Sequence, residues 1–134
     1  MVQVAPFFLV LSLALGAHSF SVEKCNLTGN WTNDLGSNMT ILAVDEKGNF
    51  AGLYNTSVAD HPNKIQQSPL VGFLHLTNPI DQPTFGFTVN WTFSDSTMAF
   101  VGQCFVDRCG KETLETTWLL WEEVPSHRDT WKAT

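Results

Sequence analysis

The chain has 134 residues, which is enough for one domain and too few for two ordinary domains. Aromatic residues make up 12%, with ten Phe and five Trp against one Tyr, so rings supply much of any core. The formal net charge of -6 excludes affinity for phosphate backbones or anionic lipid surfaces, so we expect no nucleic-acid and no membrane partner.

The N-terminal residues 1–21 are typical of a secretory signal peptide. An apolar run over residues 6–15 is followed by small residues at Ala17 and Ser19. A buried N-terminal strand or helix is the alternative. We expect cleavage after Ser19 or Ser21, which leaves a secreted domain over residues 22–134, and no later segment is long and apolar enough to anchor it in a membrane.

Short alternating runs then predict β-strands separated by turns rich in Gly, Asn, Asp and Pro. Residues 30–32 lead into a turn at 33–37, and a strand is predicted over 39–44. A hairpin turn at 45–49 precedes a strand over 50–58, in which Tyr54, Thr56 and Val58 share a face. Residues 60–63 break this strand, and a weaker one follows over 68–76.

The strongest strand signal is the stretch TFGFTVNWTF at residues 84–93, where large apolar side chains occupy every second position. A face of this kind needs an enclosed space beside it. Strands over 98–106 and 112–121 follow turns at 94–96 and 107–111, and the tail 122–134 is mostly polar and irregular. Seven short strands without helical periodicity predict an all-β antiparallel up-and-down (meander) barrel or a sandwich with an aromatic-lined interior.

Three cysteines would leave one unpaired in an oxidising compartment. A bridge between Cys25 and Cys104 would close a long loop and stabilise the fold by about 4 kcal/mol on the chain-entropy model. We favour this pair, although Cys109 could be a partner instead or could bridge to another chain.

Several Asn-x-Ser/Thr sequences are acceptors for glycosylation in a secreted protein. Asn26 and Asn38 are the stronger candidates, and Asn55 is a further acceptor within the predicted strand over 50–58. Asn90 falls inside the strand over 84–93, so we expect it to be inaccessible.

No pattern indicates catalysis or a metal site. The four His are scattered, and the chain has no HExxH, CxxC pair, GxSxG or glycine-rich phosphate loop. We therefore expect no enzyme, no metal and no cofactor. Polar uncharged residues near the strand ends, Asn33, Ser37, Tyr54 and Thr56, combine with the aromatic faces into a pattern typical of small-molecule sites. The alternative is that the rings are ordinary core and the polar residues ordinary turns.

Six stretches point to one family: GNWTNDLGSNMTI (29–41), GLYNTSV (52–58), QPTFGFTVNWTFSDS (82–96), GQCFVDR (102–108), TTWLL (116–120) and DTWKAT (129–134). Together they closely resemble the avidin/streptavidin family of biotin-binding proteins, in one register without gaps over nearly all of residues 22–134. The resemblance implies an eight-stranded antiparallel barrel with biotin inside, a Cys25–Cys104 disulfide and a homotetramer.

The resemblance also implies a ligand set. Asn33, Ser37 and Tyr54 would donate hydrogen bonds to the ureido oxygen of biotin, and Thr56 would accept one from a ureido nitrogen. Ser94 and Ser96 would hold the valerate carboxylate. The apolar walls would be Trp91, Phe93, Phe100 and Trp118, with Leu35, Val58 and Leu120 beside them. Trp131 matches the tryptophan that the family lends to a neighbouring subunit's site.

Three departures affect this ligand set. Met98 stands where the family has a threonine near the ligand sulfur. Asp60 falls beside the expected ligand carboxylate, where two negative charges would repel unless a protonated His61 offset them. A glycan on Asn55 would crowd the entrance.

A larger departure concerns the end of the sequence, which stops at Thr134 before the family's eighth strand. We therefore expect the last strand, and the residue that would meet the second ureido nitrogen, to be missing. The first and seventh strands would then present unpaired edges. We expect truncation of a longer sequence rather than an open, weakly binding barrel.

The sequence thus predicts a secreted protein that sequesters free biotin non-covalently. The leading alternative is an avidin-like structural or interaction protein with a degraded, weak or non-biotin ligand pocket. A lipocalin-like carrier of another apolar ligand is a third possibility, for which the polar set at Asn33, Ser37, Tyr54 and Thr56 would be unusual.

Overall fold

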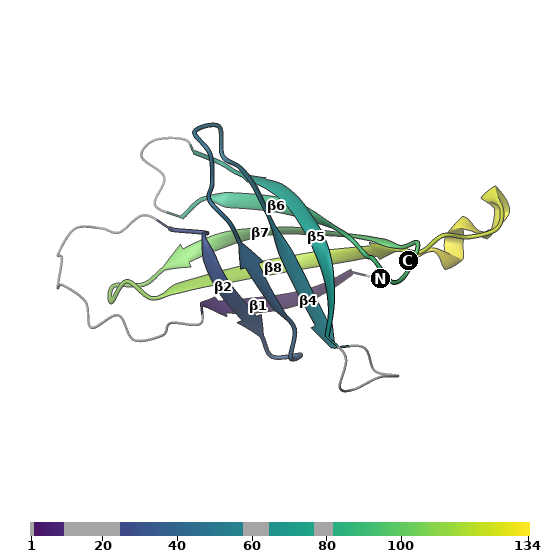
Figure 1. Cartoon of the computed structure of the whole chain (residues 1–134), viewed down its shortest axis with the longest axis horizontal. Helices are drawn as coiled ribbons and strands as arrows, with labels where there is room; N and C mark the ends of the chain where they lie inside the picture. The colour runs from purple at the N-terminus through teal and green to yellow at the C-terminus, as the bar shows by residue number, and fades with distance from the viewer. Residues whose placement is uncertain (1, 10–24, 58–64, 77–81) are drawn as a thin grey trace.

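The chain forms a closed antiparallel β-barrel in a computed structural model that describes residues 2–9, 25–57, 65–76 and 82–134 (Figure 1). Strand order around the barrel follows the sequence, each strand pairing with the next and β1 with β8. The strands are β1 Val2–Leu9, β2 Gly29–Asn33, β3 Asn38–Ile41, β4 Asn49–Ser57, β5 Ile65–Leu74, β6 Thr84–Asn90, β7 Thr97–Val106 and β8 Glu112–Trp121.

The prediction that the last strand is missing and leaves two unpaired edges is wrong, because the barrel is closed. Strand β1 lies between the two edges that were expected to be unpaired: it pairs with β8 over Val2–Phe8 and with β2 over Phe7–Leu9. Pro6 has a partner on β8 and none on β2, so its missing N–H does not interrupt the pairing between β1 and β2. The apolar N-terminal segment therefore closes the barrel, because it offers backbone groups to both edges and a ring, Phe7, to the interior. Cleavage of residues 1–21 stays a prediction.

The interior is aromatic, as the alternation over residues 84–90 predicts. Phe85, Phe87 and Val89 of β6 are buried, whereas Thr84, Thr88 and Asn90 are exposed. The expectation that Asn90 is inaccessible is wrong. Asn90 is exposed, because it lies on the same outward face of β6 as Thr84 and Thr88. The alternation also ends with the strand: Trp91 is buried, but Phe93 is 45% exposed because the chain turns away after Asn90.

The turns follow the sequence signals closely. In the hairpin between β3 and β4, Gly48 has a φ of 89°, a conformation that other residues rarely adopt. The Asp45 side chain accepts hydrogen bonds from the backbone N–H groups of Lys47 and Asn49. These bonds hold the turn predicted at residues 45–49.

The Cys25–Cys104 disulfide is present, with the two Cα atoms 6.3 Å apart. It ties the segment before β2 to the buried end of β7. Cys109 is an exposed free cysteine in the turn between β7 and β8. The pairing favoured from sequence is therefore confirmed.

The tail after β8 folds back instead of extending. It contains one short 3-10 helix, η1, His127–Lys132, which was not predicted. The Glu122 N–H donates to the Ala133 carbonyl at 2.7 Å, and Ala133 is buried. This places residues 122–125 beside the end of the barrel.

Candidate functional site

Three polar side chains converge at one end of the barrel, supplied by β2, the following turn and β4. The Asn33 Oδ1 accepts hydrogen bonds from the N–H groups of Leu35 and Ser37, both at 3.1 Å. The Asn33 Nδ2 then remains as the donor of this side chain. Burial raises the pKa of the Tyr54 hydroxyl, and hydrogen bonds with the Ser37 and Asn33 side chains oppose that rise. Asn33, Ser37 and Tyr54 are therefore within reach of a common point.

Aromatic rings surround Tyr54. Its ring stacks on Phe100 at a centroid distance of 5.6 Å and meets Trp91 edge-on at 5.4 Å. Phe7 of β1 contacts the Tyr54 and Phe100 rings at 6.5 and 5.8 Å. Trp118 faces Phe100 on the neighbouring strand and packs against the core.

The segment after β6 is fixed against β5, which sets the position of Trp91. The Thr92 N–H donates to the buried Ser68 Oγ at 3.1 Å, and the Thr92 hydroxyl donates to the Gln67 carbonyl at 2.9 Å. Trp91 then lies between the Tyr54 ring and an open pocket.

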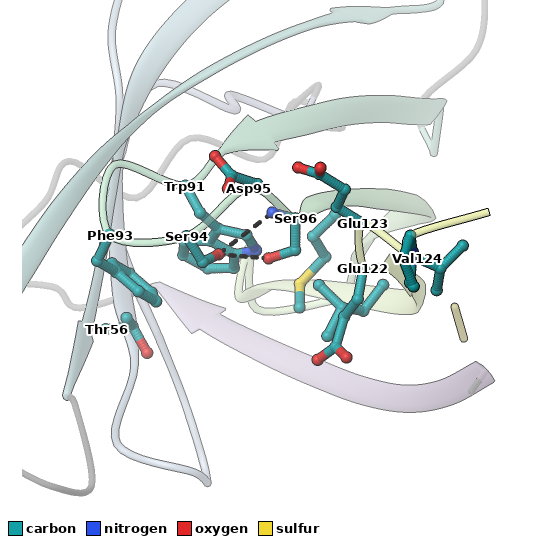
Figure 2. Close-up of a pocket in the computed structure, with 12 residues that line it drawn as sticks. Thr56, Trp91, Phe93, Ser94, Asp95, Ser96, Glu122, Glu123 and Val124 are labelled. Atoms are coloured by element: carbon teal, nitrogen blue, oxygen red, sulfur yellow. Dashed lines mark hydrogen bonds between the residues drawn. The ribbon is translucent and has the colours of Figure 1, made fainter. Parts of the chain in front are cut away.

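The pocket has a volume of about 690 Å³. Phe93 and Thr56 lie at one side, Trp91 and the Ser94–Ser96 turn in the middle, and Glu122, Glu123 and Val124 at the other side (Figure 2). The Ser94 and Ser96 hydroxyls share a hydrogen bond of 2.6 Å. The lining comprises Thr56, Trp91, Phe93, Ser94, Asp95, Ser96, Met98, Leu120, Glu122, Glu123, Val124 and Pro125.

Comparison with known proteins shows the family to which a chain with this geometry belongs. The family model described as "Avidin family" matches residues 21–134. The chain belongs to the avidin family. It is similar to avidin of Gallus gallus, with 59% identity over 94% of this chain and 83% of that protein. Among solved structures it is similar to one titled "AVR2", with a TM-score of 0.75 and 58% identity over 82% of this chain and 88% of that one. It is also similar to the structure of a "biotin binding protein from chicken", with a TM-score of 0.73 and 60% identity over 82% and 89% of the two chains.

The avidin-type ligand set predicted from sequence is only partly gathered at the pocket. Of the predicted residues, Thr56, Trp91, Phe93, Ser94, Ser96 and Leu120 line it. Asn33, Ser37, Tyr54, Phe100 and Trp118 are not among its lining residues; Tyr54 contacts Trp91 ring to ring, and Tyr54, Phe100 and Trp118 belong to the core or pack against it.

Two predicted residues lie away from this pocket. Leu35 is 71% exposed at the tip of the turn after β2. Trp131 is 75% exposed, and the Lys132 Nζ lies 5.1 Å from its ring centroid. Val58, Asp60 and His61 lie outside the described residues.

Five pocket residues were absent from the predicted ligand set: Asp95, Glu122, Glu123, Val124 and Pro125. Asp95 has only its position between the two serines to suggest it. The other four belong to the tail, which looks irregular in sequence; they directly follow β8, and the Glu122 N–H donates to the Ala133 carbonyl. Met98, predicted as a departure near the ligand, lines the pocket.

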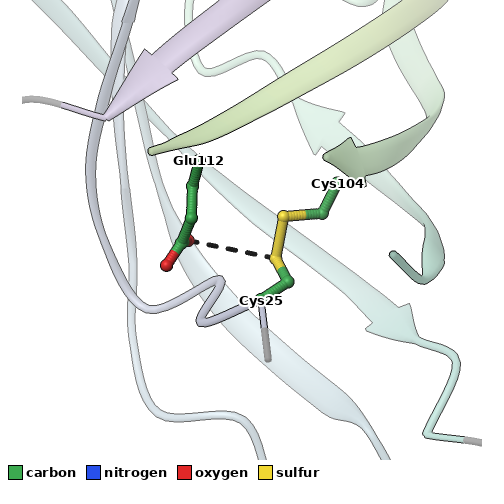
Figure 3. A group of neighbouring side chains, drawn as sticks. All are labelled: Cys25, Cys104 and Glu112. Carbon is green, nitrogen blue, oxygen red and sulfur yellow. Dashed lines mark hydrogen bonds between the residues drawn. A yellow bond between two sulfur atoms is a disulfide. The ribbon is translucent and has the colours of Figure 1, made fainter. Parts of the chain in front are cut away.

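Within the described residues, one group of three potential metal ligands comes together: Cys25, Cys104 and Glu112 (Figure 3). The two sulfurs are joined in the disulfide, and the Cys25 Sγ lies 4.0 Å from the Glu112 Oε2. A disulfide offers no thiolate, so this group does not fit a metal. In the described part of the chain, no helix has the length and apolar character needed to cross a membrane.

The three glycosylation candidates differ in their surroundings. Asn26 and Asn38 are exposed. The Asn55 Nδ2, the atom that would carry a sugar, donates to the Asn38 Oδ1 at 2.8 Å. Modification at any of them stays a prediction.

Proposed function

We propose that this chain binds biotin non-covalently and does not transform it. The observation that carries the proposal is the convergence of Asn33, Ser37 and Tyr54 beside a ring-lined pocket in a chain of the avidin family. A solved relative with 60% identity is titled as a biotin-binding protein.

The proposed pose follows from the donors. The ureido oxygen accepts hydrogen bonds from Asn33, Ser37 and Tyr54, and Thr56 accepts one from a ureido nitrogen. Prearranged donors bind a carbonyl strongly because little conformational freedom is lost when the ligand binds. The walls for the bicyclic ring and the aliphatic arm are Trp91, Phe93, Phe100, Trp118, Leu120 and Met98, and Ser94 and Ser96 meet the end of the arm.

Binding in this pose requires Trp91 to move. Its ring contacts Tyr54 at 5.4 Å, and the open pocket lies on its other side. A ligand that spans both must part the two rings. Tryptophan fluorescence should therefore change together with the binding heat.

Titration calorimetry of the folded chain with biotin tests the proposal, with parallel fluorescence. Pentanoate, which has the acid arm without the ureido ring, is the control and should give no heat. No heat and no thermal shift with biotin would refute binding and favour the structural alternative.

We further propose that the protein is secreted and forms a homotetramer. An exposed apolar groove on the outer face of β5, β6 and β7 supports self-association, since Val71, Phe73 and Val101 are 60%, 49% and 65% exposed there. Sedimentation should give tetramers for the wild type and smaller species for Val101→Glu. Leu42→Glu, at a position exposed elsewhere, is the control, and equal masses for both variants would contradict use of the groove.

A further inference from the structure

The rim of the pocket is acidic. Asp95, Glu122 and Glu123 line it: Asp95 lies beside Ser94 and Ser96, and Glu122 and Glu123 lie at the side next to this turn (Figure 2). All three carboxylate-bearing residues are exposed. We call these three residues the acidic rim.

No positive charge offsets the acidic rim among the residues that line the pocket. The Lys132 Nζ, in the tail that follows, lies 3.8 Å from the Asp129 Oδ1 and 5.1 Å from the Trp131 ring centroid. The described lining thus has three formal negative charges and no Lys, Arg or His.

The serines at the rim are also less available to an anion than the sequence suggests. Their hydroxyls bond to each other at 2.6 Å, and the Ser96 N–H points to the Ser94 Oγ at 3.3 Å. A carboxylate must break this local bonding while it approaches three like charges. A neutral amide avoids the repulsion, and an ammonium group is attracted.

We propose that this site prefers biotin whose carboxyl group is in amide linkage to an amine, above all one that carries a positive charge, over the free biotin anion. This inference rests on the proposed function, because it concerns the end of the same ligand. The barrel end would recognise the ureido ring, and the acidic rim would select the charge at the other end. Glu122 and Glu123 are the specificity-determining residues.

The effect is a charge effect at an exposed rim, so it should be moderate and sensitive to salt. Each unit of ligand charge should change affinity roughly threefold at low ionic strength. The ratio should shrink in about 0.5 M salt, where screening acts over a few ångströms.

The test uses three ligands with the same ring: biotin (charge −1), biotinamide (0) and N-biotinyl-ethylenediamine (+1). Calorimetry with the folded full chain at neutral pH should give affinities that rise in this order, with roughly a tenfold range at low salt. In the double variant E122Q/E123Q, the affinities for the three ligands should differ much less than in the wild type. The control E46Q/E115Q removes the same net charge at exposed residues outside the lining, and it should keep the wild-type range.

The outcomes separate the two proposals. If all three ligands bind but biotin is equal or tighter at low salt, the charge preference is wrong and biotin binding stands. If E122Q/E123Q keeps the wild-type range of affinities, the acidic rim is not its cause and this inference is wrong. If E46Q/E115Q narrows the range as much, net charge and not the acidic rim is responsible. If none of the three ligands binds, the proposed function fails and this inference fails with it.

Discussion

The role of β1 in closing the barrel can be tested through Phe7. Its side chain is fully buried and contacts the rings of Tyr54 and Phe100 at 6.5 and 5.8 Å. Replacing a buried Phe with Ala typically costs about 3–5 kcal/mol. Because small domains are stable by only about 5–15 kcal/mol, Phe7→Ala should remove a large part of the free energy of unfolding. Urea denaturation of the refolded, oxidised full chain measures it.

Val4→Ala is the matched control, because Val4 is on the same strand but 73% exposed, and it should change stability by less than about 0.5 kcal/mol. A chain of residues 22–134 lacks the strand altogether and leaves the edges of β2 and β8 unpaired. It should be the least stable form, and added peptide of residues 2–9 should restore part of the loss. Equal effects of Phe7→Ala and Val4→Ala would refute closure of the barrel by β1, and would fit a protein in which this segment is cleaved as a signal peptide.

Three further predictions concern the core and the site. Trp118→Ala should weaken biotin binding by about 2 kcal/mol or more if the ring is a wall of the site, measured by competition, and an unchanged affinity would remove it from the ligand set. Cys104→Ser should cost about 2–5 kcal/mol in urea denaturation, whereas Cys109→Ser at the exposed free cysteine should cost almost nothing, so equal losses would contradict the structure. The pKa of Tyr54 is raised in the folded state, so the unfolded chain loses this proton first and stability should fall as pH rises above about 10. Tyr54→Phe should lack that part of the fall above about pH 10, and it should weaken biotin binding by about 1 kcal/mol through the lost donor; a variant with the wild-type pH profile would refute the burial argument.

The strands that a sequence pattern predicts well here are those with one face in the core and a tight turn at each end. The predicted ranges 98–106 and 112–121 agree with β7 and β8 to within a residue, because alternation and turn chemistry are local properties. The failures come from pairing that is not local. Residues 2–9 have the composition of a leader, and nothing in their own sequence reveals that β2 and β8 present open edges on either side.

The same distinction explains the site. Asn33, Ser37 and Tyr54 stand out in the sequence only as polar residues near predicted strand ends, their roles come from the family resemblance, and the structure brings them together. Glu122 and Glu123 were not in the predicted ligand set, because the tail that begins with them looks polar and irregular in sequence, although they directly follow β8 at the end of the barrel. Under the proposed function, the donors for the ureido ring lie in β2, the turn after it and β4, whereas the acidic rim lies in the turn after β6 and directly after β8. A change in the tail would then alter which biotin derivative is preferred without disturbing the donors that hold the ureido group.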